Sequence, residues 1–571
     1  CARTAFYVQS FSDFPAEIRA PIGTLAGVSS FNLVFSRSEL THVPKDIDLL
    51  VALNPAAYTV LQHRASSRTV ILFDSDQWTE RAFAKAKLNG DPLKELKNKL
   101  MPVPLTMLAS GLESQFHLSA AKAKKNRNMI AVGIVLWMQN IDLTYGIEWI
   151  VNRYPASITD ILIAALQIGY AYAETTEIDS SSSIDRKISF AVPYQLNNSI
   201  DVKSTQVTGN EAIILGLIQA SARHRRSIFL AGYPITPASD LLQYARKFAS
   251  TSLQVIQAED EIAAAGMALG ASYAGAIGVS CTSGPGFDLK SEMIGLGIMA
   301  ELPLVIIDVQ RSGPSTGMPT KTEQTDLLAA LFGRHGESWV SVFAIPNVKS
   351  AISVINDAVD WSVKTMSPVI ILSEAALAHT STVIVYEESL PYTGWNNTAE
   401  TPFAKRNEMG APSWIIPGTP DRQSCIGGLE RHLETGEVSY DAQNHERMIQ
   451  LRRSKIENQA QPYDWVCGDD KSVLWITFGS VSGSIDYYRQ HVAQNMIGDH
   501  LVLTQIWPLP SNFWDILRHY QKCFVVELSD GQLVRYLRSF GRNVSFESHC
   551  QITGQALDCE RLSKWVEEIS K

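Results

Sequence analysis

Short apolar runs recur at regular intervals between residues 205 and 385. They cover residues 227–231, 253–258, 276–281, 303–309 and 368–372. These strand-length apolar runs recur roughly every 25 residues, and helical patterns such as Ile262–Ala274 lie between them. This alternation is typical of βαβ units. We therefore expect residues 205–385 to form an α/β domain with a parallel sheet.

Two further α/β patterns flank this region, in residues 1–175 and 471–571. The first includes a helix-rich stretch from about Leu105 to Arg153. The candidate strands are Ala5–Gln9, Phe31–Phe35, Asp48–Ala52 and Thr69–Phe73 in the first region, and Val473–Phe478, Leu501–Gln505 and Phe524–Glu527 in the last. The chain is therefore predicted to be a multidomain α/β protein.

The remaining two segments are polar. Residues 176–204 include four consecutive serines at 180–183, a composition typical of a flexible linker. Residues 386–470 are rich in Thr, Asn, Pro and Glu and end in a charged helical pattern over His445–Glu457. We interpret them as a connecting excursion.

The composition is that of a globular protein and excludes several classes. The chain has 571 residues, is 45% hydrophobic and carries a net charge of −9, with no dominant basic cluster, which disfavours nucleic acid as a partner. No uninterrupted apolar run is long enough to span a bilayer and no secretory signal is evident, so we expect a cytoplasmic protein without a membrane partner. Its seven dispersed cysteines lack a C-x-x-C pair, which favours reduced thiols and predicts no metal or iron–sulfur site in this chain.

Polar residues and glycine turns follow the predicted strands of residues 205–385. Thr236 follows the first strand, Glu261 the second, the turn 284–286 the third and Arg311 the fourth. Because the carboxyl ends of parallel strands meet at one edge of a sheet, we expect these residues to converge on one crevice.

Each of these features also has a simple structural explanation. An acidic residue in the first turn of a helix, such as Glu261, often only complements the helix dipole. An arginine such as Arg311 is commonly a surface charge, and a Gly-Pro-Gly turn often reflects only tight backbone geometry. Their joint occurrence after neighbouring strands favours a functional site.

The motifs at these positions resemble those of a known family. Y-P-I-T-P at 233–237, A-E-D-E-I-A-A at 258–264, T-S-G-P-G-F at 282–287 and R-S-G-P-S-T-G-M-P-T-K-T-E-Q at 311–324 resemble, in order and spacing, the α subunit of 2-oxoacid:ferredoxin oxidoreductases. F-P-A-E-I-R at 14–19 and G-T-L-A-G-V at 23–28 resemble the γ domain of the family, here fused ahead of α. E-L-S-D-G-Q-L-V-R at 527–535 is similar to the family's C-terminal domain.

The resemblance covers nearly the whole chain, is weakest over 386–470 and implies a fold for each part. Residues 1–175 would be a γ-type α/β domain, residues 205–385 a thiamine-diphosphate-binding parallel sheet, and residues 471–571 a transketolase C-terminal-like domain. The sequence given begins after the point where family γ domains usually carry a glycine-rich turn, which leaves open any coenzyme A role for residues 1–175.

The resemblance also implies an activity. Such enzymes cleave a 2-oxoacid with thiamine diphosphate, transfer electrons through iron–sulfur clusters to ferredoxin and form an acyl-CoA. Many run in reverse and fix CO2, as in the reductive tricarboxylic acid cycle. We expect 2-oxoglutarate and succinyl-CoA here, with pyruvate or indolepyruvate as alternative substrates. A catalytically silent scaffold on the same fold, or a non-redox thiamine lyase or transketolase-like enzyme, are the competing hypotheses.

By this resemblance, Glu261 is the carboxylate that hydrogen-bonds N1′ of the cofactor's aminopyrimidine and promotes its imino tautomer. Tyr233, Pro234 and Ile235 would line the cofactor site. Pro234 and Pro237 stiffen the segment between them.

The resemblance likewise implies the substrate-binding residues. Arg311 would bind the carboxylate of the 2-oxoacid through paired hydrogen bonds, with Thr236 and Thr320 as further contacts. For the distal carboxylate of 2-oxoglutarate we consider Arg127, because Arg127-Asn128-Met129 resembles the family's K-N-M. The alternative for Arg127 is a solvated helix charge.

The family's remaining cofactor elements are not evident in the sequence. Gly468-Asp469-Asp470 with Asn495 has the spacing of a diphosphate and Mg2+ motif, but the third glycine is missing and the strand follows the turn. We therefore expect a β subunit to supply the diphosphate site, Mg2+ and a [4Fe-4S] cluster, with ferredoxin as electron partner and an (αβ)2 assembly.

Overall fold

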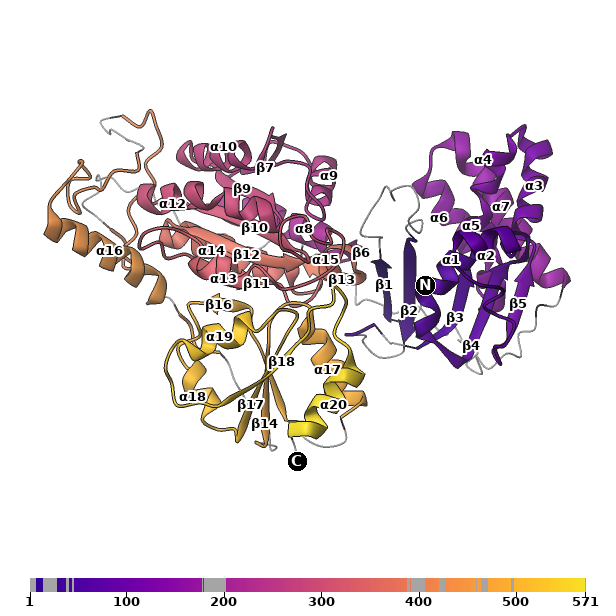
Figure 1. The fold of residues 1–571 in the computed structure, drawn as a ribbon. Helices are drawn as coiled ribbons and strands as arrows, with labels where there is room; N and C mark the ends of the chain where they lie inside the picture. The colour runs from indigo at the N-terminus through magenta and orange to yellow at the C-terminus, as the bar shows by residue number, and fades with distance from the viewer. Residues whose placement is uncertain are drawn as a thin grey trace.

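Parallel sheets organise most of the chain, which is a mixed α/β protein (Figure 1). The computed structural model describes residues 7–13, 28–36, 41–43, 46–176, 178, 202–387, 391, 406–420, 427–458, 460–463, 471–493 and 498–569. The γ-like motifs at 14–19 and 23–27, most of the predicted linker, and Gly468–Asp470 with Asn495 lie outside these residues.

The central sheet has the strand order β16-β11-β12-β10-β9-β7-β8. Its strands are β7 (Ile228–Gly232), β8 (Leu253–Gln257), β9 (Ile277–Thr282), β10 (Leu304–Gln310), β11 (Ser341–Ala344), β12 (Pro368–Glu374) and β16 (Gln505–Trp507). All neighbours are parallel except β11 and β16, so the predicted parallel sheet is confirmed. The short strand β11 and the antiparallel strand β16 were not predicted.

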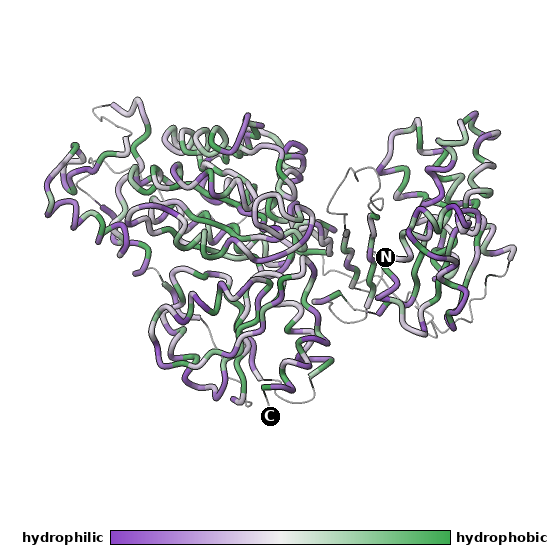
Figure 2. The backbone as a smooth tube through the Cα atoms, in the orientation of Figure 1, coloured by the Kyte–Doolittle hydropathy of each residue, from purple (hydrophilic) through white to green (hydrophobic). Residues whose placement is uncertain are grey.

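Helices cover both faces of this sheet, whose inner strands β9, β10 and β12 are buried along their whole length (Figure 2 colours the backbone by hydropathy). On β10, Val305 and Ile307 pack with α8 (Gly209–His224), α9 (Ser239–Lys247) and α14 (Ala351–Thr365). Leu304 and Ile306 pack on the opposite side, with α10 (Glu261–Tyr273), α12 (Ser291–Ala300) and α13 (Leu327–Phe332). A continuous apolar run is what a strand buried on both faces requires.

The helix α10 lies unusually close to the sheet. A Cβ atom added at Gly278 of β9 would lie 2.0 Å from the carbonyl oxygen of Ala268 in α10. Glycine at this position therefore sets the distance of α10, and with it the place where the helix begins.

The C-terminal region forms a second parallel sheet with the order β15-β14-β17-β18. Its strands are β14 (Val473–Thr477), β15 (Asp499–Val502), β17 (Lys522–Glu527) and β18 (Phe546–Cys550), and its helices α17 (Val481–His491), α18 (Phe513–Leu517), α19 (Gln532–Arg538) and α20 (Cys559–Ile569). The single strand predicted over 501–505 is wrong, because the chain passes there from β15 to β16 of the central sheet.

Gln324 joins the two sheets. Its Nε2 donates to Glu374 Oε1 at 2.8 Å and to the carbonyl of Phe478 at 2.7 Å, and its backbone N–H donates to the carbonyl of Leu528 at 2.8 Å. Glu374 also accepts from the backbone N–H of Ser480 at 2.8 Å. The last residue of the motif at 311–324 thus fixes the C-terminal domain against the central one.

An antiparallel sheet connects the N-terminal segment to the central domain. Its order is β2-β1-β13-β6, with β1 (Tyr7–Asp13), β2 (Ser30–Ser36), β6 (Val202–Thr208) and β13 (Ser381–Glu387). The sequence assigned the first two strands to the first α/β domain and did not predict β6 or β13. In this sheet Ser10 of β1 pairs with Ser381 of β13. A local sequence pattern cannot predict a pairing between residues so far apart in the chain.

The first domain carries a parallel sheet of β3 (Ile47–Ala52), β4 (Ala65–Asp74) and β5 (Leu100–Val103) in the order β3-β4-β5. Its helices are α1 (Pro55–Leu61), α2 (Glu80–Lys85), α3 (Leu105–Phe116), α4 (Ala120–Lys124), α5 (Arg127–Met138), α6 (Leu143–Arg153) and α7 (Ala156–Thr175). The predicted helix-rich stretch is confirmed and continues through α7. The domain boundaries stay a prediction.

Helix α7 is, by length and composition only, apolar enough to cross a membrane. It packs against α5 through glycines. A Cβ atom added at Gly169 would lie 1.9 Å from the carbonyl oxygen of Ile130, and one at Gly133 would lie 2.1 Å from that of Leu166. These backbone contacts make α7 part of the core of the first domain.

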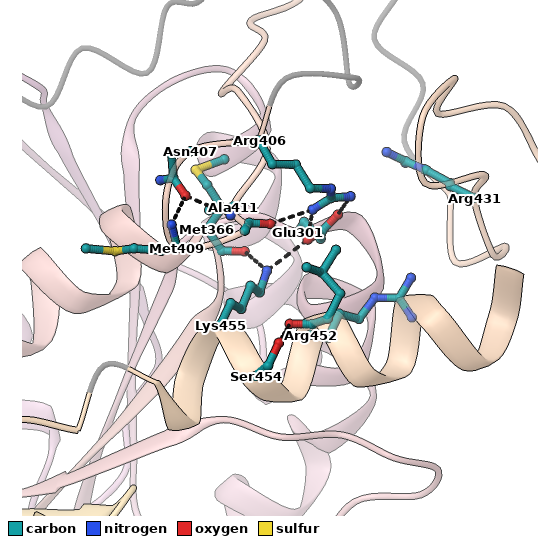
Figure 3. Close-up of polar contacts among 12 residues, drawn as sticks. Glu301, Met366, Arg406, Asn407, Met409, Ala411, Arg431, Arg452, Ser454 and Lys455 are labelled. Atoms are coloured by element: carbon teal, nitrogen blue, oxygen red, sulfur yellow. Dashed lines mark hydrogen bonds and ion pairs between the residues drawn. The ribbon is translucent and has the colours of Figure 1, made fainter. Parts of the chain in front are cut away.

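The described part of the polar excursion is held by a buried ion cluster around Glu301 (Figure 3). Arg406 contacts both carboxylate oxygens of Glu301 at 2.9 Å, and Lys455 of α16 (Ala442–Glu457) contacts Oε1 at 2.9 Å. Burial alone would raise the pKa of Glu301, but the two cations outweigh it and lower the pKa to about 2. The predicted charged helix is confirmed and begins at Ala442.

Candidate active site

Four strand ends of the central sheet lie next to one another and carry the predicted site residues. The neighbours β10, β9, β7 and β8 run parallel, so the segments that follow them leave the sheet at the same edge. Gly232 aligns with Gln257, and Asp308 aligns with Thr282. The predicted convergence of these segments on one edge is confirmed.

Glu261 begins α10 directly after β8. The side chain of Asp260 caps the helix by accepting the backbone N–H of Ala263 at 2.8 Å. Glu261 therefore sits in the first turn of α10, and its side chain is partly exposed.

Tyr233, from the turn after β7, lies beside Glu261. Its hydroxyl hydrogen-bonds Thr282 Oγ1 at 2.7 Å. Burial chiefly, together with the nearby Glu261 carboxylate, raises the pKa of this phenol. Tyr233 is thus a neutral hydrogen-bonding group in the site.

Gly286 makes this packing possible. A Cβ atom there would lie 1.9 Å from the Tyr233 hydroxyl, 2.5 Å from Thr282 Oγ1 and 2.8 Å from Glu261 Cγ. Only a glycine fits, which explains the T-S-G-P-G turn physically. The turn brings the ends of β7, β8 and β9 into one cluster.

Arg311 follows β10 and is only 6% exposed. Its Nη1 donates to the backbone carbonyl of Thr236 at 2.6 Å. Burial lowers the pKa of the guanidinium, and the buried Nε has no hydrogen-bond partner among the described residues. The predicted pair of Arg311 and Thr236 is in contact, through the main chain of Thr236 rather than its hydroxyl.

Two buried carboxyl groups lie near Arg311. Burial and the neighbouring Asp326 raise the pKa of Asp308 well above its ordinary value, and burial raises the pKa of Asp326 to about 6. Both carboxyl oxygens of Asp308, near the end of β10, are buried and have no hydrogen-bond partner among the described residues. The pair places about one negative charge near the guanidinium.

Thr320 lies in the loop after Arg311. The backbone N–H of Ser312 donates to the carbonyl of Lys321 at 2.9 Å, and that of Met318 donates to the carbonyl of Ser312 at 3.0 Å. Gly317 has φ +46°, and a Cβ atom there would lie 2.4 Å from the Ser312 carbonyl oxygen. The loop is closed on itself and projects to solvent, with Thr320 half-buried near its base.

Arg127 lies elsewhere. It begins α5 in the first domain, and its Nη1 pairs with the fully buried Asp74 at 2.5 Å. Its other contacts, to Thr106 at 3.3 Å and to the carbonyl of Lys124 at 3.2 Å, are in the same domain. Its charge is matched locally, and its predicted role toward the substrate stays a prediction.

Two polar residues of the site, Thr282 and Asp326, were not predicted, whereas Lys290 stands out in the sequence as an unusual residue near the pocket but its burial was not predicted. Thr282 and Lys290 contact Tyr233 and Glu261, and Asp326 lies near Arg311. Thr282 lies within the motif T-S-G-P-G-F, where its residue type alone assigns it no role. A lysine next to an apolar helix gives no sequence signal of complete burial.

Comparisons with known proteins agree with this geometry. A sequence profile described as the thiamine diphosphate-binding part of pyruvate flavodoxin/ferredoxin oxidoreductase matches residues 221–450. A profile described as pyruvate ferredoxin/flavodoxin oxidoreductase matches residues 1–172. The 2-oxoglutarate oxidoreductase subunit KorA of Mycobacterium tuberculosis is 37% identical over 97% of this chain and 86% of its own length.

The chain belongs to the 2-oxoacid:ferredoxin oxidoreductase family. A second relative, the 2-oxoglutarate synthase subunit KorA of Archaeoglobus fulgidus, is 31% identical over 58% of this chain and 89% of its own length. A solved family structure, the 2-oxoglutarate:ferredoxin oxidoreductase of Magnetococcus marinus with 2-oxoglutarate, coenzyme A and succinyl-CoA bound, covers 100% of this chain and 95% of its own, with TM-score 0.80 and 27% identity.

Within this family, the start of α10 has the donor set that the aminopyrimidine end of thiamine diphosphate needs. The partly exposed Glu261 carboxylate can hydrogen-bond a ring nitrogen, and its neighbours Ala258 and Ala263 are small. Tyr233 and Thr282 supply neutral hydroxyls. These residues therefore fit one half of the cofactor.

Proposed function

We propose that this chain is the α subunit of a 2-oxoglutarate:ferredoxin oxidoreductase. The observation that carries the proposal is the placement of Glu261 and Arg311 at one edge of the central sheet, where Lys290 hydrogen-bonds the backbone carbonyl of Glu261 and Arg311 hydrogen-bonds that of Thr236. The names of the relatives, and the molecules bound in the Magnetococcus marinus enzyme, support 2-oxoglutarate and coenzyme A as substrates.

Glu261 is the activating carboxylate in this proposal. Bound thiamine diphosphate supplies a carbon nucleophile for the 2-oxo carbon. Glu261 holds and exchanges a proton at N1′ of the aminopyrimidine. Tyr233, Pro234 and Ile235 line the same side of the site, with Gly286 holding Tyr233 against Glu261.

Arg311 binds the carboxylate of the 2-oxoacid. Its contact with the Thr236 carbonyl fixes the guanidinium plane, while the buried and unpartnered Nε is a donor that a ligand carboxylate would satisfy. The hydroxyl groups of Thr236 and Thr320 add further substrate contacts. Thr236 thus has two separate roles, one through its carbonyl and one through its side chain.

A β subunit completes the enzyme. It supplies the diphosphate site with Mg2+ and the [4Fe-4S] cluster that passes single electrons to ferredoxin, in an (αβ)2 assembly in the cytoplasm. The test compares this chain alone with the copurified complex. We expect the chain alone to be colourless and to bind thiamine diphosphate weakly. A brown, redox-active preparation of this chain by itself would contradict the proposal that the β subunit supplies the iron–sulfur cluster.

The activity test uses the native complex with coenzyme A and a panel of 2-oxoacids. We expect viologen or ferredoxin reduction that is fastest with 2-oxoglutarate. Faster reduction with pyruvate or indolepyruvate would keep the enzyme class and change the substrate. No reduction with any 2-oxoacid, in a complex that contains the cofactor and cluster, would favour the silent scaffold.

A further inference from the structure

Lys290 is a fully buried lysine beside Glu261. It joins α11 (Gly284–Leu289) to α12 and is 0% exposed. The chain passes from α11 to α12 at this residue, so its backbone position is fixed on both sides. A buried ammonium costs free energy unless each of its protons has a partner, so its position needs an explanation.

The surroundings of the ammonium match its three N–H donors. Nζ donates to Ser280 Oγ at 2.8 Å and to the backbone carbonyl of Glu261 at 3.2 Å. The Tyr233 ring lies on a further side, with its centroid 5.0 Å from Nζ, within the range of a cation–π contact. Lys290 thus connects β9, the first turn of α10 and the turn after β7.

The charged groups near Lys290 come from three elements. Burial lowers its pKa to about 8, while Cys281 of β9, Glu261 and Asp260 at the start of α10, and Asp308 of β10 act in the opposite direction. Cys281 is itself neutral near pH 7, because burial raises the pKa of its thiol to about 11. The cation therefore faces mainly the acidic start of α10.

We propose that Lys290 is a positioning residue of the active site, which fixes the first turn of α10 and keeps a positive charge behind Glu261. This inference rests on the proposed function of Glu261 and extends it to a residue that does not contact the substrate. The hydrogen bond from Lys290 Nζ to the carbonyl of Glu261 restricts the direction from which the Glu261 side chain leaves the helix.

The proposal predicts a pH effect with a definite sign. Protonated Lys290 is present below about pH 8 and is lost as the pH rises through that value. Activity and thiamine diphosphate affinity should therefore decline above about pH 8 in the wild-type complex, because the charge behind Glu261 disappears.

The main test is Lys290→Met in the complex with the β subunit, because methionine keeps the length and fills the buried space. Calorimetric titration with thiamine diphosphate and Mg2+ should show a dissociation constant about tenfold higher. The turnover number should fall with little change in KM for the 2-oxoacid, and the decline above about pH 8 should be absent. An unchanged dissociation constant for thiamine diphosphate, together with an unchanged decline in activity above about pH 8, would overturn the proposal.

A second variant, Ser280→Ala, keeps the lysine but removes one acceptor of its charged form. The pKa of Lys290 should fall, so the basic limb should move to lower pH, an effect that a purely structural lysine would not produce. This variant also keeps the test decisive if Lys290→Met fails to fold. Lys247→Met, at an exposed lysine of α9, is the matched control and should change none of these quantities.

The outcomes separate this inference from the proposed function. A wild-type complex that reduces no acceptor with any 2-oxoacid contradicts the proposed function. An active wild-type complex whose Lys290→Met and Ser280→Ala variants keep the wild-type pH profile and cofactor affinity contradicts only the role of Lys290.

Discussion

Two arginines, Arg127 and Arg311, lie at the carboxyl edges of two different parallel sheets and differ in how their charge is matched. Arg127 is paired with Asp74 at the end of β4, a carboxylate that is fully buried. Arg311, next to β10, is held by the Thr236 carbonyl, and within the described part of the chain no carboxylate lies in salt-bridge distance of it. The Thr236 carbonyl orients the Arg311 guanidinium without forming an ion pair with it, so Arg311 can still pair directly with a ligand carboxylate, whereas Arg127 is already paired with Asp74.

The largest expected effect comes from Glu261, the proposed activating carboxylate. Glu261→Gln keeps size and helix capping and removes the ionisable group, so turnover in the complex should fall by roughly 10³-fold or more. Folding, measured by thermal unfolding, should be unchanged. Glu292→Gln on the exposed face of α12 is the matched control. Near-normal turnover of the Glu261→Gln variant would show that Glu261 is not the activating carboxylate.

Arg311→Ala tests whether the Arg311 guanidinium binds the substrate. Loss of a charge-assisted contact should lower kcat/KM for 2-oxoacids by about 100-fold, or roughly 3 kcal/mol. Steady-state kinetics with several 2-oxoacids measure this, and the loss should be similar for all of them because they share the 1-carboxylate. Unchanged kcat/KM would place the carboxylate site elsewhere.

Arg127→Ala tests the other half of the comparison. It leaves the buried Asp74 without its cation, so we expect a loss of roughly 3 kcal/mol in the free energy of unfolding, measured by urea denaturation. The ratio of activity with 2-oxoglutarate to that with 2-oxobutyrate, which lacks the distal carboxylate, is the second readout. A changed ratio at unchanged stability would make Arg127 the second substrate cation predicted from the sequence.

Thr236→Val gives the smallest expected effect. It removes the hydroxyl and keeps the carbonyl that orients Arg311, so kcat/KM should fall by about tenfold or less. Comparison with Arg311→Ala separates the two roles of Thr236. A loss as large as that of Arg311→Ala would mean that the hydroxyl, and not the guanidinium, is the main substrate contact.

The sequence predicted the parts whose signal is local. Strands such as β10 and β12 are apolar on both faces and stand out as uninterrupted runs, and their parallel order places Glu261 and Arg311 at one edge. The short strand β11 and the divided segment 499–507 have no such signal, because their partners are supplied by distant residues.

The polar connections of the site could not be predicted for a related reason. Whether Arg311 contacts the carbonyl or the hydroxyl of Thr236 depends on main-chain geometry, which residue types do not specify. The burial of Lys290 depends on Ser280 and on the distance of α10 from the sheet, which Gly278 sets from another element. The sequence thus predicts which charged residues lie at a sheet edge but not the groups to which they hydrogen-bond.

The strand order β2-β1-β13-β6 has a consequence for how the first domain is connected. The first domain, residues 46–176, leaves this sheet after the edge strand β2 and returns to it before the opposite edge strand β6. The first domain is thus an insertion whose two connections reach opposite edges of one four-stranded sheet, and the two inner strands β1 and β13 separate those connections.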